Sequence, residues 1–142
     1  MKNWEDIAAT SEHHAVLEIK RSLEEGNYQD VEDGLDTLLE AMGRAEKRAI
    51  KSQLIRLMFH VIKWNIQPEK RSRSWRKTIN DARDEIADEQ AFSPSLNRRY
   101  IEEIWEKAFL QAKRGAEDET GLSTQHIENL TWEEVFEQEY KL

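Results

Sequence analysis

The chain has 142 residues, which is enough for one domain of ordinary size. Its 21 basic and 29 acidic residues give a formal net charge of −8, and 35% of the residues are charged. Five Gly and two Pro are few for this length, which argues against a turn-rich β-sandwich and favours a few long helices. The absence of Cys excludes disulfides, thiolate metal sites and Cys nucleophiles.

The chain shows no sign of a membrane or secretory segment. No apolar run approaches the length of a membrane span, and the start MKNWEDIAAT lacks the apolar stretch of a secretory signal. We therefore expect a cytoplasmic protein that does not interact with membranes. The expected fold is an all-α single domain over residues 1–142, a bundle of about five or six helices around a long central helix.

Apolar residues at steps of three and four predict two helices in the first half of the chain. The first covers residues 11–25, with Gly26 as its stop signal. The second covers residues 30–66, with Asp30 as its N-cap and Pro68 ending it. This second helix is the expected centre of the bundle.

Three further helices are predicted after the long one. The first runs from residue 72 or 74 to residue 90, and the next begins at Pro94, directly after a capping Ser. That helix should end before Gly121, and residues 131–134 have the capping-box spacing that opens a short last helix. The large apolar residues expected in the core are Leu57, Val61, Trp105 and Phe109.

Charge is strongly segregated along the chain. Residues 1–43 contain 3 basic and 11 acidic residues, residues 44–83 contain 12 and 3, and residues 84–142 contain 6 and 15. The basic density of residues 44–83 permits nucleic-acid binding. The two acidic segments that flank it must pack against it, however, and can neutralise much of its charge.

Sequence motifs for catalysis are missing. The chain has none of the phosphate-binding loop, zinc-protease, nucleophile-elbow or di-iron signatures. His60 lies on a polar stripe of an apolar helix and has no second ligand at helical spacing, so we expect it to be neither catalytic nor a metal ligand. It is interpreted as a histidine hydrogen-bonded at the edge of the core, or as a contact for a ligand or partner. No cofactor is expected.

Basic and aromatic residues are densest around the turn between the second and third predicted helices. Arg side chains beside Trp rings can bind phosphate or carboxylate groups while stacking. The helix start at Pro94 would add free backbone N–H groups to such a site if it packs at the same end. The alternative is that Trp64 and Trp75 close the end of the bundle under Arg side chains. The candidate binding residues are His60, Lys63, Arg71, Arg73 and Arg76, and the candidate structural residues are Trp64, Trp75 and Pro94.

Several short motifs lie between residues 52 and 121: His60, Lys63-Trp64, Gln67-Pro68, Arg71, Ser74-Trp75, Arg83, Pro94-Ser95-Leu96 and Thr120-Gly121. With these features the segment resembles the bacterial family known as domain of unknown function twenty-nine, with a weaker match back to about Gly26. In that family paired acids stand where this chain has Thr37 and Leu38, and a Pro-rich, Cys-containing stretch stands in place of residues 126–131. The resemblance implies an all-helical fold and brings no established activity.

The leading functional hypothesis is a non-enzymatic module that binds another protein through a charged helical face. The first alternative is nucleic-acid binding through residues 44–83, and the second is a small-anion binder or enzyme at the turn of residues 63–76. A homo-oligomer is compatible with each of these hypotheses.

Overall fold

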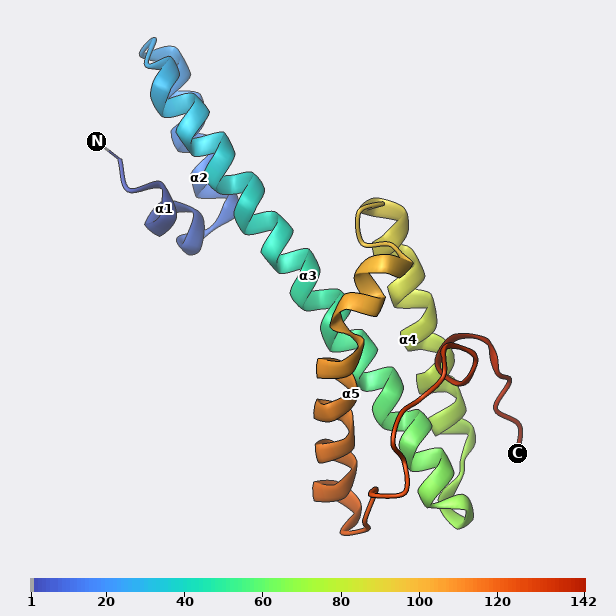
Figure 1. Cartoon of the computed structure of the whole chain (residues 1–142). Helices are drawn as coiled ribbons and strands as arrows, with labels where there is room; N and C mark the ends of the chain where they lie inside the picture. Colours follow the sequence, from blue (N-terminus) through green and yellow to red (C-terminus); the bar gives the residue numbers. More distant parts are fainter. Residues whose placement is uncertain (1) are drawn as a thin grey trace. The chain divides into compact units, whose positions relative to one another are not determined.

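The structure is a computed structural model and describes residues 2–142. These residues form α-helices, short helical turns and irregular segments but no strand, which confirms the predicted all-α class (Figure 1). The longest helix has 39 residues and is the one that the sequence predicts. In chain order the elements are α1 (Trp4–Thr10), α2 (Glu12–Glu24), α3 (Tyr28–Ile66), η1 (Pro68–Lys70), α4 (Arg73–Phe92), α5 (Arg98–Thr120) and the π-helical turn η2 (Glu133–Glu137).

Contacts within the chain divide it into two compact units. The N-terminal unit extends to Lys47 and the C-terminal unit is Arg48–Leu142, so α3 contributes residues to both. Each unit is described here by itself. The single domain over residues 1–142 stays a prediction.

The N-terminal unit consists of α1, α2 and the first part of α3. Its core is small, because only four buried apolar residues form the cluster. Gly34 is the point of closest approach: a Cβ at this position would lie 2.7 Å from Ile19 and 2.8 Å from Trp4. The short helix α1 has no counterpart among the predicted elements. The four buried residues are Trp4, Ala15, Ile19 and Leu38.

Two of the expected helix starts are wrong. The N-cap of α3 is Asn27 and not Asp30, because the Asn27 side-chain oxygen accepts the Asp30 N–H at 3.2 Å. The helix α5 begins at Arg98, not at Pro94. Ser93 already ends α4 by donating its N–H to an α4 carbonyl, so Pro94 lies in an exposed turn. Asn97 caps α5 instead.

The C-terminal unit holds the main core. Leu57, Val61 and Phe109 are buried there, as the sequence predicts. Trp105 is only partly buried, which corrects its assignment to the core: its ring stacks on that of Trp132, which is also only partly buried, and both rings cover the outside of the core.

The irregular segment after α5 is part of this core. Gly121 ends α5 in the left-handed conformation, as predicted. Leu130, Val135 and Tyr140 of the following segment are buried, and Figure 1 shows this segment running beside α4. The predicted capping box opens η2, because Thr131 and Glu134 exchange hydrogen bonds of 2.9 and 3.1 Å.

Candidate functional site

The turn between α3 and α4 carries a small pocket of about 260 Å³, called here the turn pocket. Lys63 is buried at its wall and pairs with Glu119 of α5 at 2.8 Å. The Lys63 ammonium also lies 4.4 Å from the centre of the Trp75 ring and 5.1 Å from that of Phe59. These contacts already satisfy the cation, so it has little capacity left for an external anion. The lining residues are Lys63, Gln67, Lys70, Trp75, Glu119 and Thr120.

Arg71 is tied to the end of α3. Its Nε donates a hydrogen bond of 2.8 Å to the Trp64 carbonyl, and its guanidinium lies 5.2 Å from the centre of the Trp64 ring. The last carbonyls of a helix have no partner within the helix, so this hydrogen bond satisfies one of them. Trp64 itself is 4% exposed and meets the Tyr140 ring edge-on. The geometry gives Arg71 a structural contact, and its role in binding stays a prediction.

The structure does not bring Arg73 and Arg76 to the turn pocket. The Arg73 side chain is exposed and takes part in no ion pair or side-chain hydrogen bond among residues 2–142. Arg76, one turn later on α4, lines a different pocket together with Arg83. The five candidate binding residues therefore occupy separate places.

His60 lies at the edge of the C-terminal core. Its Nδ1 is 2.9 Å from the Arg56 carbonyl, so Nδ1 carries the proton and donates it. Its ring meets Phe59 edge-on, with 5.2 Å between the ring centres. Burial lowers the pKa of His60, since the charged imidazolium is poorly solvated there. Among residues 2–142, no three His, Asp or Glu side chains are placed to hold a metal ion.

A second pocket of about 250 Å³, called here the basic pocket, lies between α4 and the C-terminal segment. Arg83 anchors it by donating to two carbonyls of η2, at 2.7 Å to Val135 and 3.3 Å to Glu134. The Tyr140 hydroxyl donates to the same Glu134 carbonyl at 2.5 Å. Burial raises the pKa of Tyr140 to about 12, so this hydroxyl stays neutral. The lining residues are Arg76, Asn80, Arg83, Glu139, Tyr140 and Lys141.

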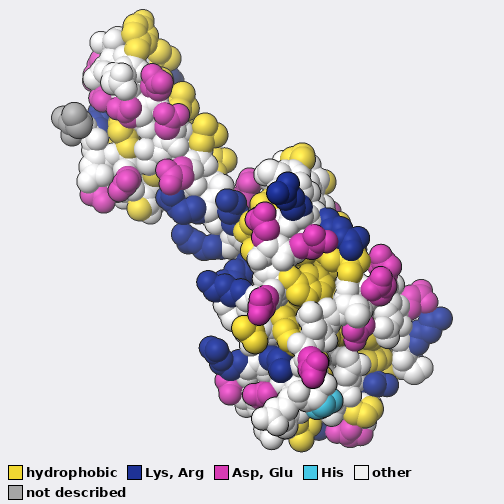
Figure 2. Space-filling view, in the orientation of Figure 1, with side chains coloured by type: hydrophobic (Ala, Val, Ile, Leu, Met, Phe, Trp, Pro, Cys, Tyr) yellow, Lys and Arg dark blue, Asp and Glu magenta, His cyan; other side chains and the backbone are white. Residues whose placement is uncertain are grey.

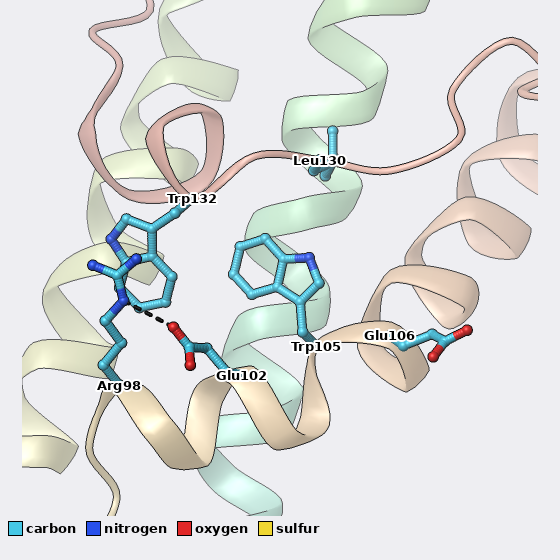
Figure 3. A pocket seen from close by; sticks show the side chains of 6 residues that line it. All are labelled: Arg98, Glu102, Trp105, Glu106, Leu130 and Trp132. Atoms are coloured by element: carbon cyan, nitrogen blue, oxygen red, sulfur yellow. Dashed lines mark hydrogen bonds and ion pairs between the residues drawn. The ribbon is translucent and has the colours of Figure 1, made fainter.

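A third pocket of about 340 Å³, the tryptophan pocket, lies between α5 and the segment before η2 (Figure 3). The rings of Trp105 and Trp132 are stacked, with 5.7 Å between their centres. Arg98 lies 4.1 Å from the centre of the Trp132 ring and pairs with Glu102 at 3.0 Å. Partly exposed Trp rings beside an Arg are typical of the residues that anchor protein partners. The lining residues are Arg98, Glu102, Trp105, Glu106, Leu130 and Trp132.

The N-terminal unit carries a row of exposed apolar side chains, called here the apolar face. On both α2 and α3, the exposed apolar residues lie about a quarter of a turn around the helix axis from the buried residues. The rotation has the same direction in both helices when each is followed from its N-terminus to its C-terminus. Because α2 and α3 run in opposite directions, both rows lie on one side of the helical hairpin. Figure 2 shows hydrophobic side chains along one edge of this unit, with acidic side chains beside them. The residues of the apolar face are Val16, Leu23, Leu35, Leu39 and Met42.

Several of these side chains carry no local signal in the sequence that marks them as site residues. Arg83 belongs to the family pattern but was not a candidate site residue, because its partners lie 51 and 52 residues away. Trp132 stands within the capping-box segment of residues 131–134, which predicts a helix start and no site. The apolar face has a signal in the sequence. The segments of α2 and α3 contain more apolar residues than the four that the small N-terminal unit buries, so some of them must be exposed.

Taken together, the fold and the surface define an all-helical protein with a basic pocket, an aromatic pocket and an exposed apolar face. No helix in the described part of the chain is long and apolar enough to cross a membrane. Residues 14–141 match the model of the family described as "Domain of unknown function DUF29", and the chain belongs to this family. Neither the curated proteins nor the solved structures contain a significant match.

Proposed function

We propose that this chain is a protein-binding module and that the apolar face of the N-terminal unit is its main contact. The observation that carries the proposal is the exposure of large apolar side chains on one side of the unit. Leu39 is 66% exposed, Leu23 53% and Val16 52%. A contiguous apolar surface edged by charges is the usual mark of a protein interface, because water contact with it is unfavourable.

The negative charge of the N-terminal unit indicates that its partner carries basic residues. Residues 1–47 contain five basic and twelve acidic residues. Glu32 and Asp36 are exposed on α3 and lie one turn apart beside Leu35 and Leu39. A partner segment with an apolar face edged by Lys or Arg complements this surface. A second copy of the same acidic unit would be repelled.

The test is a selection of displayed peptides against the full chain. We expect enriched peptides with apolar residues at steps of three and four and with flanking Lys or Arg. Binding of one such labelled peptide is then measured for the wild type and for Leu39→Glu. The substitution should weaken binding at least about tenfold, because it places a charge in the apolar contact.

Leu110→Glu is the matched control, because Leu110 is an exposed leucine of the C-terminal unit. It should leave peptide binding unchanged. Equal losses in the two variants, or selected peptides without basic residues, would contradict the proposal. A marked drop in the melting temperature of Leu39→Glu would do so too, since it would show that Leu39 is buried in the molecule in solution.

Nucleic-acid binding through residues 44–83 stays an alternative prediction. Three cations of this segment are engaged in ion pairs: Arg44 with Glu40, Lys63 with Glu119 and Lys77 with Asp81. Electrophoretic mobility of labelled DNA and RNA at two salt concentrations tests this alternative. A real phosphate-binding surface gives retardation that weakens steeply with salt.

A further inference from the structure

We propose that the basic pocket of the C-terminal unit binds a single phosphoryl group, held by Arg76, Arg83 and Asn80. This inference concerns a different surface from the apolar face and does not depend on the proposed function. The class of ligand is the phosphate monoester dianion or inorganic phosphate.

The first observation is that the pocket is pre-organised. Arg83 is half-buried, and its Nε and one terminal nitrogen are fixed by the carbonyls of Val135 and Glu134 at 2.7 and 3.3 Å. Its guanidinium also lies 5.6 Å from the centre of the Tyr140 ring. A guanidinium held in this way loses little conformational freedom when it binds an anion. The remaining terminal nitrogen makes no hydrogen bond to the described residues.

The second observation is an uncompensated positive charge. The chain has more acidic than basic residues, yet among residues 2–142 no carboxylate pairs with Arg76 or Arg83. The acid that lines the pocket, Glu139, lies 3.2 Å from Lys141 and pairs with it. The Tyr140 hydroxyl is neutral and cannot serve as the counter-ion. A partly buried cation with no counter-charge is unfavourable until an anion joins it.

The third observation is geometric. Arg76, Asn80 and Arg83 are spaced four and three residues apart, so α4 presents them on one face. They place the Arg76 guanidinium, the remaining terminal nitrogen of Arg83 and the Asn80 amide around the same volume. Three cations and one acid line the pocket, and this balance matches a dianion better than a carboxylate with one charge.

The size of the pocket limits the ligand. Its volume of about 250 Å³ is below the ~300–1,000 Å³ of pockets that enclose a whole drug-sized molecule. The pocket therefore suits one anionic group, either as a free ion or at the end of a larger molecule. Inorganic phosphate and O-phosphoserine represent these two sources.

The experiment is a nuclear magnetic resonance titration of the full chain with inorganic phosphate, O-phosphoserine and acetate at constant ionic strength. We expect saturable shifts of the Asn80 side-chain amide and the Arg83 Nε–H signals with both phosphates, and much weaker shifts with acetate. Arg76→Gln should raise the dissociation constant about tenfold, since it removes a charge-assisted hydrogen bond. Tighter binding of O-phosphoserine than of inorganic phosphate would identify a phosphorylated molecule as the source.

Arg73→Gln provides the matched control, because Arg73 is an exposed arginine of the same helix that does not line the basic pocket. Its affinity for phosphate should equal that of the wild type, and Arg76→Lys should retain part of the binding. Shifts that do not saturate, or equal losses in Arg73→Gln and Arg76→Gln, would overturn the proposal. Equal binding of acetate and phosphate would overturn the assignment of the ligand class.

Discussion

Arg71 and Arg73 show how two similar side chains in one turn differ once the chain is folded. They are separated by one residue, and sequence reasoning treats them as one pair of candidate anion ligands. The structure ties Arg71 to the Trp64 carbonyl and ring, whereas Arg73 is exposed to solvent. The difference arises because Arg71 follows η1, where the chain folds back on the end of α3.

We therefore predict that Arg71→Ala lowers the free energy of unfolding by about 1–2 kcal/mol, through loss of the hydrogen bond to Trp64 and of the contact with its ring. Arg73→Ala should change it by less than about 0.5 kcal/mol, as surface substitutions usually do. Chemical denaturation of the two variants provides the comparison. Equal effects would show that the contact between Arg71 and Trp64 contributes nothing to stability.

A second prediction at the residue scale concerns pH. Because burial lowers the pKa of His60 below its ordinary value of 6.5, the unfolded chain binds more protons than the folded chain between the two values. The stabilising contribution of His60 is therefore complete above pH 6.5 and declines as the pH falls through the lowered pKa. In His60→Gln this part of the pH dependence should disappear from the free energy of unfolding. An NMR titration midpoint at or above 6.5 for His60 would contradict the prediction.

At the scale of the helical elements, two glycines of α3 differ in their surroundings. Gly34 lies against Ile19 and Trp4, and an added Cβ would meet them at 2.7–2.8 Å. A Cβ at Gly43 would have no neighbour within 4 Å. The first glycine permits close packing of the N-terminal unit, whereas the second only increases the freedom of the unfolded chain.

We predict opposite effects of alanine at these two positions. Gly34→Ala should destabilise the N-terminal unit by about 1–3 kcal/mol, because the small core must shift to accept the methyl group. Gly43→Ala should stabilise α3 by about 0.5–1 kcal/mol. Hydrogen exchange of the amides up to Lys47, measured in both variants, checks the two signs. A loss of protection in both variants would show that Gly43 also has a packing role.

At the scale of the whole molecule, the two units have very different cores. The N-terminal unit buries four apolar residues in its cluster, whereas the cluster of the C-terminal unit contains five fully buried Ile, Leu and Met residues from α3 alone. Stability rises with the apolar area removed from water, so the two units should differ in local stability. The five residues are Ile50, Leu54, Leu57, Met58 and Ile62.

We predict that the N-terminal unit opens at a lower denaturant concentration than the C-terminal unit. Hydrogen exchange in increasing denaturant resolves the two units amide by amide, and the amides before Lys47 should lose protection first. A peptide bound to the apolar face should raise the stability of that unit selectively, because it binds only the folded form. Simultaneous loss of protection in both units would show that they unfold as one cooperative domain.

The helical class and most helix bounds could be predicted from the sequence alone, because apolar periodicity, caps and stop signals act within a few residues. The capping box at Thr131 and the helix stops at Gly26 and Gly121 are local features of this kind. Local signals gave a wrong helix start where two of them competed. Ser93 and Pro94 predict the start of a helix, but in the structure Ser93 is the C-cap of α4 and the next helix begins later.

Which side chains share a pocket could not be predicted in this way, because it depends on how distant segments pack. Arg83 meets η2 across more than fifty residues, and Lys63 of α3 pairs with Glu119 of α5. Which cation finds a carboxylate depends on packing between distant segments, and periodicity within one helix does not contain that information. The same holds for the apolar face: spacing shows that Leu35 and Leu39 lie on one stripe, but only the packing of α2 against α3 leaves that stripe exposed.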